Sequence, residues 1–296
     1  MRVFVTGATG FIGTALIPHL LGAGHQVLGL CRSEEKAGAL GAAGAEVARG
    51  SLEDLDGLKA AASSADAVVH LAFNHDFSRY VENCADDRRV IEALGAALAG
   101  SDRPLIVTSG TGMALTAPGE PVTEDAPALN SAMMPRAATE EAAAAVSARG
   151  GNAIVVRLPQ VHDTVKQGLV TPAIALFREK GACFYIGDGE NRWPAAHVSD
   201  VARLYQLALE KARGGAIYHA VGEEGVRVRD IAEVLSRRLD LPLKSITPEQ
   251  AGDYFGWLAM FAALDLPASS RRTREELGWT PSGPTMLEDL ERLRQS

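Results

Sequence analysis

Apolar and polar positions follow two alternating periods along the first half of the chain. Short β-branched runs with the character of buried strands cover residues 2–6, 25–30, 45–48, 66–71, 104–108 and 153–158. Between them, helical spacing covers residues 11–21, 33–40, 52–62, 80–99 and 135–149. Strands that alternate with helices in this way predict an α/β fold, a doubly wound parallel sheet with ligands bound at the carboxyl ends of its strands.

The alternation loosens after residue 160, where prolines divide the chain into shorter pieces. Residues 198–211, 228–239 and 248–263 are predicted to be helical, and residues 216–220 to form a strand. We therefore expect a dinucleotide-binding domain at 1–160 and a smaller substrate-binding region at 161–296, with parts of 161–225 completing the sheet. Within it, residues 254–261 gather four aromatic side chains and a methionine. They fit a buried helix, a cleft wall or a subunit contact.

Composition narrows the class of partner. Hydrophobic residues make up 47% of the 296 positions and charged residues 22%, which indicates a well-packed globular protein. A net charge of −8 argues against nucleic acid as a partner. Three widely spaced cysteines suggest neither disulfides nor a metal site and favour the cytoplasm. The longest apolar stretch, 255–266, is too short to cross a bilayer, so we expect a small-molecule partner and no membrane.

The first predicted strand turns into the first helix through Gly7, Gly10 and Gly13. Glycines allow the tight turn and let the phosphates approach the backbone at the positive end of the helix dipole, which suits a pyrophosphate. We therefore assign the three glycines, with Thr9, Phe11 and Ile12 between them, to a dinucleotide cofactor.

The end of the second strand distinguishes the two nicotinamide dinucleotides. An acidic residue there would accept hydrogen bonds from the ribose hydroxyls and repel a 2′-phosphate. Arg32 and Ser33 instead supply a cation and a hydroxyl, so NADP(H) is favoured over NAD(H). The alternative is that Arg32 is a solvated surface side chain.

The motif at residues 6–13 resembles that of the extended short-chain dehydrogenase/reductases, the epimerase/dehydratase-like branch. Similar motifs follow in the same order at residues 66–72, Asn83, 105–109, 156–161, 193–202 and 277–281. The resemblance implies a Rossmann fold and an oxidoreductase or epimerase-like activity. It adds to the cofactor site Leu71, Ala72, Phe73, Thr108, Arg136, Pro159, Val161 and His162. It also places Ser51 and Leu52 beside the adenine, where the serine can accept a hydrogen bond from the adenine amine.

The chain departs from that family at its catalytic pair. The family uses a tyrosine and a lysine four residues later, and no Tyr-x-x-x-Lys occurs here. Counting back from Arg157 places Ala132 at the tyrosine position and Arg136 at the lysine position, with Glu140 one turn beyond. Arginine can bond ribose hydroxyls, but alanine cannot transfer a proton. The simplest interpretation of Arg136 and Glu140 is an i,i+4 ion pair.

Four other side chains are candidates for the missing proton donor. Thr111 or Ser109 could donate a hydrogen bond after the fifth strand, and His75 could act as an acid after the fourth. The alternative for His75 is an exposed loop histidine paired with Asp76. His162 could line the cofactor or act as an acid, whereas His70, inside a strand, is expected to be a satisfied core residue.

Three functions are compatible with this sequence. The first is an NADP(H)-dependent oxidoreductase that acts on a small, fairly apolar carbonyl or hydroxyl compound through a non-standard proton donor. The second is a regulatory protein that senses the dinucleotide without turnover. A sugar-nucleotide epimerase or dehydratase comes last, because those reactions depend most on the missing tyrosine. The resemblance also implies a homodimer through helices 80–99 and 135–149.

Overall fold

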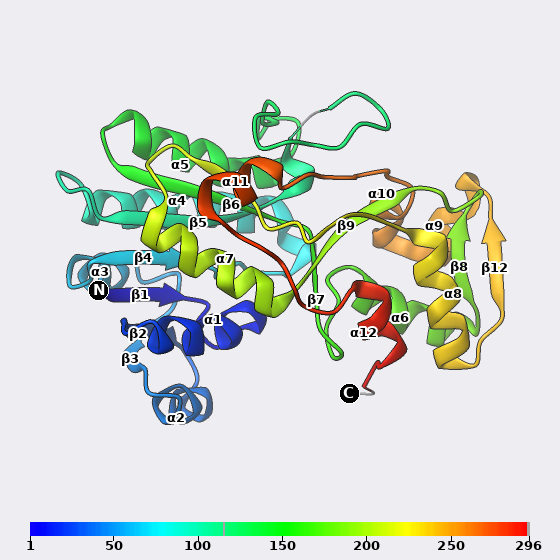
Figure 1. Ribbon diagram of the computed structural model, residues 1–296, viewed down its shortest axis with the longest axis horizontal. Coiled ribbons are helices and arrows are strands. Elements are labelled where there is room, and N and C mark those ends of the chain that lie inside the picture. The colour runs from blue at the N-terminus through cyan, green and yellow to red at the C-terminus, as the bar shows by residue number, and fades with distance from the viewer. Residues whose placement is uncertain (115, 295–296) are drawn as a thin grey trace.

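The computed structural model describes residues 1–114 and 116–294. Its centre is a seven-stranded sheet in the order β10-β6-β5-β4-β1-β2-β3, with every neighbouring pair parallel (Figure 1). The strands are β1 (Arg2–Thr6), β2 (Gln26–Cys31), β3 (Glu46–Arg49), β4 (Ala67–His70), β5 (Pro104–Gly110), β6 (Asn152–Leu158) and β10 (Ile217–His219). The predicted doubly wound sheet is confirmed. Its strand order reverses between β1 and β4, which is where such folds bind ligands.

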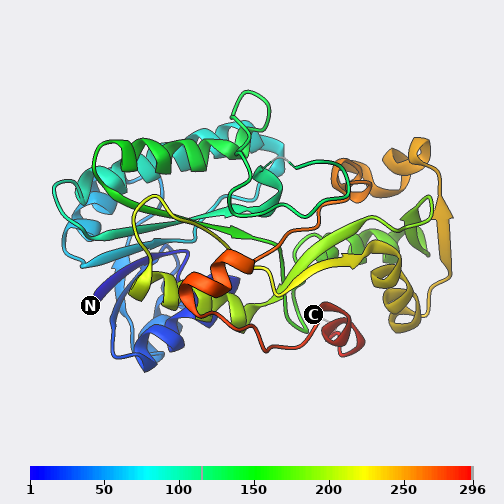
Figure 2. The same ribbon diagram turned by 45° about the horizontal axis from the view of Figure 1, so that its top comes forward.

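Successive side chains of the strands enter two separate cores, one on each face of the sheet. Val3 and Val5 pack in one core with α1 (Phe11–Gly22), α2 (Glu34–Ala42) and α7 (Val198–Lys211). Phe4, between them, packs in the other with α3 (Leu55–Ser63), α4 (Tyr80–Ala97) and α5 (Ala138–Ala148). Figure 2 shows the sheet between these two layers. Both faces of each strand are therefore buried, which explains the continuous apolar runs of the sequence.

The rest of the chain builds a smaller region beside the sheet. Its strands form a three-stranded sheet of β7 (Gln160–His162), β9 (Arg192–His197) and β11 (Glu223–Arg227), and a parallel pair of β8 (Cys183–Ile186) and β12 (Leu243–Ile246). Its helices are α6 (Val170–Lys180), α8 (Val228–Leu239), α9 (Ala251–Phe255), α10 (Ala259–Ala262) and α12 (Met286–Glu291). Most of these elements share a separate core. The strand β10 returns to the main sheet and lies beside β6.

Short 3-10 turns and one further helix join these parts. The turns are η1 (Phe77–Arg79), η2 (Thr111–Met113), η3 (Pro135–Ala137), η4 (Pro248–Gln250) and η5 (Gly256–Leu258), and the helix is α11 (Arg271–Leu277).

The single helix predicted over residues 248–263 is wrong. The segment is divided into η4, α9, η5 and α10, and the break after α9 falls at Gly256, whose φ of 53° is left-handed. Only glycine adopts this conformation readily, so Gly256 ends the helix. Tyr254, Phe255 and Phe261 pack in the C-terminal core, whereas Trp257 is exposed and stacks on Phe77.

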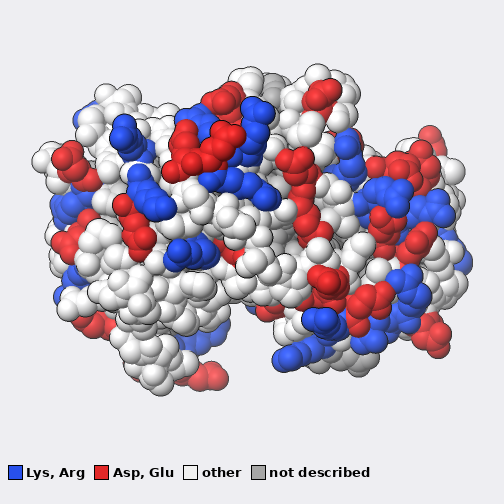
Figure 3. Space-filling model, viewed as in Figure 1, with Lys and Arg blue, Asp and Glu red and all other residues white. Residues whose placement is uncertain are grey.

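The surface shown in Figure 3 carries acidic and basic side chains interspersed over the same elements. Within residues 1–114 and 116–294, every helix is either too short or too polar to span a membrane.

Candidate functional site

The turn between β1 and α1 brings the backbone close together. Gly7 has a φ of 67°, and a Cβ atom on it would lie 2.8 Å from the Ala72 nitrogen. A Cβ atom on Gly13 would lie 2.2 Å from the Gly7 carbonyl oxygen. The N-cap of α1 is Gly10, which has no side chain to cap the helix. The N–H groups of the first helical turn therefore stay available to a ligand. These contacts explain the glycine spacing and fit the cradle that a pyrophosphate needs.

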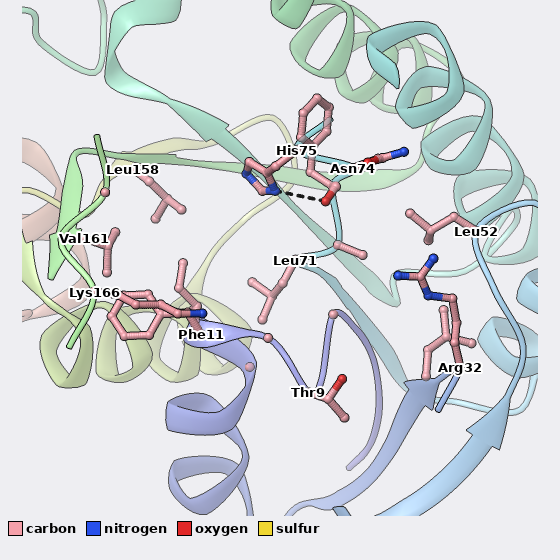
Figure 4. Close-up of a pocket in the computed structure, with 18 of the residues that line it drawn as sticks. Thr9, Phe11, Arg32, Leu52, Leu71, Asn74, His75, Leu158, Val161 and Lys166 are labelled. Atoms are coloured by element: carbon pink, nitrogen blue, oxygen red, sulfur yellow. Dashed lines mark hydrogen bonds between the residues drawn. The ribbon is translucent and has the colours of Figure 1, made fainter. Parts of the chain in front are cut away.

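A cavity of about 800 Å³ opens from this turn along the carboxyl ends of β1, β2, β4 and β6 (Figure 4). Fifteen of the residues singled out from the sequence line it: Gly7, Thr9, Gly10, Phe11, Ile12, Gly13, Arg32, Ser51, Leu52, Leu71, Ala72, Phe73, His75, Pro159 and Val161. Nine more line it that sequence reasoning missed: Leu30, Lys36, Glu53, Asn74, Leu158, Lys166, Gly168, Thr171 and Pro172. The structure therefore brings most of the predicted cofactor residues to one cavity.

One end of the cavity carries opposite charges. Arg32 and Lys36 line it together with the carboxylate of Glu53. A hydrogen bond from Ser51 lowers the pKa of Glu53, and the charge of Arg32 adds to this. Ser33 lies outside the lining, because its hydroxyl caps α2 by accepting the Lys36 N–H at 3.4 Å. The serine predicted to contact a phosphate therefore has a structural partner instead.

The other end is apolar except for one cation. In Figure 4, Lys166 extends along the ring of Phe11, near Leu158 and Val161 and across the cavity from Arg32. Its Nζ atom lies 5.8 Å from the centroid of that ring. The lysine follows β7 in a turn that the Asp163 carboxylate holds by accepting the Lys166 N–H at 2.7 Å. A loop lysine has no sequence periodicity to mark it, which is why it was missed.

Arg136 is held away from the cavity. Its Nη1 donates to the Asp87 carboxylate at 2.6 Å and its Nη2 to the Thr108 carbonyl at 2.9 Å. Its guanidinium covers the ring of Phe73 at 4.0 Å, so Phe73 lines the cavity and Arg136 does not.

The ion pair predicted between Arg136 and Glu140 is wrong. Glu140 accepts two hydrogen bonds from the fully buried Arg157, at 2.9 and 2.7 Å. Thr108 also lies outside the lining, because its hydroxyl donates to the His70 carbonyl at 2.8 Å.

A buried network connects the glycine turn to Arg136. His70 lies 2.7 Å from the Thr6 hydroxyl through Nδ1, and its Nε2 donates to Asp87 at 3.0 Å. His70 is thus a satisfied core residue, as predicted. Burial raises the pKa of Asp87, but the charge of Arg136 and the bond from His70 outweigh burial and hold that pKa at about 2. Asp87 is therefore a stable buried anion that fixes Arg136.

The two hydroxyls proposed as proton donors lie outside the cavity lining. Ser109 is buried and donates to the Glu140 carboxylate at 2.7 Å. Thr111 is also buried, in η2. Ser109 lies near the end of β5 and Thr111 directly follows that strand, whereas no residue of β5 lines the cavity.

His75 lines the cavity but is not paired with Asp76, whose carboxylate accepts the Ser78 N–H at 3.0 Å. The Nδ1 atom of His75 donates to the Phe73 carbonyl at 3.1 Å, so Nδ1 carries the proton of the neutral ring. Desolvation in the cavity wall and then the charge of Arg136 lower the pKa of His75. The imidazole is therefore neutral near pH 7, with Nε2 free to accept a hydrogen bond.

His162 is wrongly predicted as a cavity residue. It is fully buried, and its Nδ1 donates to the Asp289 carboxylate of α12 at 2.7 Å. Neighbouring side chains of a strand point to opposite faces, so Val161 faces the cavity and His162 faces away.

The described residues contain no group of three His, Cys, Asp or Glu side chains that could hold a metal ion. The three cysteines are buried thiols without a disulfide.

Comparison with known proteins places this geometry in a family. The model of the NAD dependent epimerase/dehydratase family matches residues 3–221. An uncharacterized protein of Schizosaccharomyces pombe is 46% identical, and one of Saccharomyces cerevisiae 39% identical, each over 98% of both chains. The crystal structure of DesIV, a dTDP-glucose 4,6-dehydratase from Streptomyces venezuelae with NAD bound, superposes with a TM-score of 0.78 at 20% identity, over 99% of this chain and 95% of that one. The chain belongs to the NAD dependent epimerase/dehydratase family.

Proposed function

We propose that this chain is an NADP(H)-dependent oxidoreductase of the short-chain dehydrogenase/reductase type that acts on a small carbonyl or hydroxyl compound. The observation that carries this is one continuous cavity with a glycine cradle, two cations at one end, and His75 and Lys166 as further titratable groups in its wall. When bound there, a nicotinamide dinucleotide would supply or accept the hydride.

The preference for NADP(H) depends on the balance of charge at the Arg32 end. Arg32 and Lys36 offer two cations to a 2′-phosphate, whereas Glu53 is the single carboxylate in the lining. Glu53 already has a partner in Ser51, and Arg32 lies close enough to lower its pKa. A phosphate dianion with two cations nearby is favoured over the bare hydroxyl of NAD(H).

Lys166 is the side chain best suited to replace the missing tyrosine as proton donor. A carbonyl that accepts hydride develops an alkoxide, which needs a proton or a positive charge beside it. The neutral His75 offers a lone pair at Nε2 and cannot donate from there. An ammonium group donates readily. We therefore assign proton donation in the reductive direction to Lys166. The reverse reaction passes through the same transition state, so the same amine accepts the proton in the oxidative direction, and His75 offers a hydrogen-bond acceptor in the same cavity wall.

One observation favours a second function, a regulator that binds the dinucleotide without turnover. The hydroxyls of Ser109 and Thr111 lie outside the cavity lining, and alanine occupies position 132. A sugar-nucleotide epimerase or dehydratase remains the weakest candidate for the same reason.

The first test is a fluorescence titration of the protein with NADPH and with NADH, followed by a panel of carbonyl compounds. We expect tighter binding of NADPH, and an Arg32→Ala variant should weaken it about tenfold while leaving NADH binding unchanged. Arg238→Ala, at an exposed arginine of α8, is the matched control. Tighter binding of NADH, or an unchanged variant, would refute the phosphate contact. Tight binding without turnover over the whole panel would favour the regulator.

A further inference from the structure

A chain of aromatic rings leads from the cavity wall into the C-terminal region. Phe73 and His75 line the cavity, with ring centroids 5.2 Å apart, and His75 lies 6.3 Å from Phe77. Phe77 stacks on Trp257 at 4.7 Å with an interplanar angle of 20°, and Trp257 meets Phe261 at 6.4 Å. We call these five residues the aromatic bridge. Its first three members follow β4 and its last two belong to η5 and α10, so it joins the two halves of the molecule.

The middle of the aromatic bridge is open to solvent. Phe77 is 40% exposed and Trp257 is 44% exposed, although they stack on each other. The segment that carries Trp257 is firmly anchored, because Phe255 and Leu258 on either side of it are buried. Trp257 therefore projects from a fixed backbone instead of belonging to a loose loop.

Two further apolar side chains near the exposed rings in the sequence are also exposed. Val81, four residues after Phe77, is 64% exposed, and Met260, three residues after Trp257, is 63% exposed. Exposed aromatic side chains that continue into a cavity wall are typical of a ligand-binding site. The continuity of the exposed rings with the cavity wall at His75 makes a small molecule the occupant that the geometry favours.

The side chains of the aromatic bridge favour a planar, apolar ligand. Aromatic faces bind other aromatic faces through offset stacking and dispersion, and offer few hydrogen bonds to sugar hydroxyls. His75 contacts both Phe73 and Phe77, so a molecule stacked on the bridge would have its inner edge at His75. A carbonyl at that edge would lie in the wall of the same cavity as Lys166.

We propose that the aromatic bridge is the substrate-binding wall, and that the substrates are planar aromatic aldehydes or ketones. This assignment rests on the proposed oxidoreductase function. In the reductive direction, hydride from the reduced nicotinamide adds to the carbonyl carbon and a proton adds to its oxygen. The products are the aryl alcohol and the oxidised dinucleotide.

The tryptophans of the chain allow a direct binding test. The chain has three, and Trp193 and Trp279 are buried, so Trp257 is the one that a ligand in solution can reach. We expect 2-naphthaldehyde to quench the fluorescence of the purified protein, and the Trp257→Leu variant to lose this quenching. A second copy of the chain covering Trp257 would make its quenching by acrylamide fall with rising protein concentration, and would overturn the proposal.

Steady-state kinetics with an aromatic and a non-aromatic aldehyde test whether the aromatic bridge binds the substrate. With NADPH, we expect kcat/KM for 2-naphthaldehyde to exceed that for cyclohexanecarbaldehyde by at least about tenfold. Trp257→Leu should remove most of this preference by raising KM, whereas Trp257→Phe should retain it because the ring is kept. Equal rates for both aldehydes, or a preference that survives Trp257→Leu, would overturn the proposal while the oxidoreductase function stands. Quenching through Trp257 without any turnover would support the wall and refute the oxidoreductase function.

Discussion

The two ends of the cavity are built in different ways. At the cofactor end, close backbone contacts define the site, and Gly7, Gly10 and Gly13 are fixed by the distances to their neighbours. At the opposite end, side chains from distant elements meet: His75 follows β4 and Lys166 follows β7, and the aromatic bridge continues outside the cavity from His75 to Trp257 of η5. The first arrangement needs one local motif, whereas the second needs the whole fold. Changes at the first should therefore abolish binding, and changes at the second should alter turnover and selectivity.

The largest effect is expected at Gly13. In Gly13→Ala the new Cβ would lie 2.2 Å from the Gly7 carbonyl oxygen and 2.7 Å from that of Ala8, so backbone must move. We expect loss of dinucleotide binding and destabilisation by about 3 kcal/mol or more, measured by NADPH titration and thermal unfolding. Gly22→Ala at the other end of α1 is the matched control, since a Cβ there meets nothing within 4 Å. Normal NADPH binding by Gly13→Ala would contradict the close-packed turn.

The sequence predicts the part of the site that depends on a local motif better than the part that depends on the whole fold. The strand, turn and helix at the N-terminus were predictable, because glycine spacing and apolar periodicity are local signals. The C-terminal strands β8, β9, β11 and β12 were missed, since they are short and have no clean alternation. Lys166 was missed because only the fold brings its loop beside Phe11.

The errors also have local physical causes. His162 was misplaced because its neighbour Val161 faces the cavity, and a strand sends adjacent side chains to opposite faces. The ion pair of Arg136 and Glu140 was predicted from their spacing, but spacing cannot show that Asp87 binds Arg136 and that Arg157 binds Glu140. Spacing predicts which element carries a residue, whereas its partner depends on tertiary packing.

The next largest effect is expected at Asp87, the buried carboxylate that accepts hydrogen bonds from His70 and Arg136. Its folded pKa of about 2 lies below the ordinary value of 3.8, so ionised Asp87 stabilises the fold above that ordinary pKa. This contribution, about 2 kcal/mol by linkage, is lost as the pH falls through about 4 toward 2. Asp87→Asn should remove this part of the acid dependence of urea unfolding and, by leaving Arg136 partly buried without its charge partner, cost about 3 kcal/mol at pH 7.

The neighbouring variant Asp86→Asn is the matched control for Asp87. Asp86 pairs with Arg89 on the surface, where ion pairs contribute little. An acid dependence that is the same in Asp87→Asn and in the parent protein would show that the buried network does not hold the aspartate ionised.

Substitution of Lys166 and of Lys36 should show that the two ends of the cavity have different functions. We expect Lys166→Met to lower kcat for carbonyl reduction about a hundredfold, through loss of the proton donor, and to change the Kd for NADPH little. Lys36→Met should do the reverse and raise that Kd about tenfold without changing kcat. Steady-state kinetics and fluorescence titration measure both. If Lys166→Met weakened NADPH binding and spared kcat, Lys166 would be a cofactor contact and the donor would have to be sought elsewhere.

The smallest effect is expected at His75, and it should be equal in both directions of the reaction. Because desolvation and the charge of Arg136 lower its pKa, His75 remains an unprotonated hydrogen-bond acceptor at pH 6.5, the ordinary pKa of histidine. Activity that depends on this acceptor should therefore keep its rate at pH 6.5 and fall only at lower pH. His75→Gln should lower kcat/KM for reduction and for oxidation by the same factor, about tenfold, because both directions share one transition state. The same variant should also lose the acid limb of the pH profile. An acid limb that persists in His75→Gln would assign the titration to another group and leave His75 as part of the aromatic bridge alone.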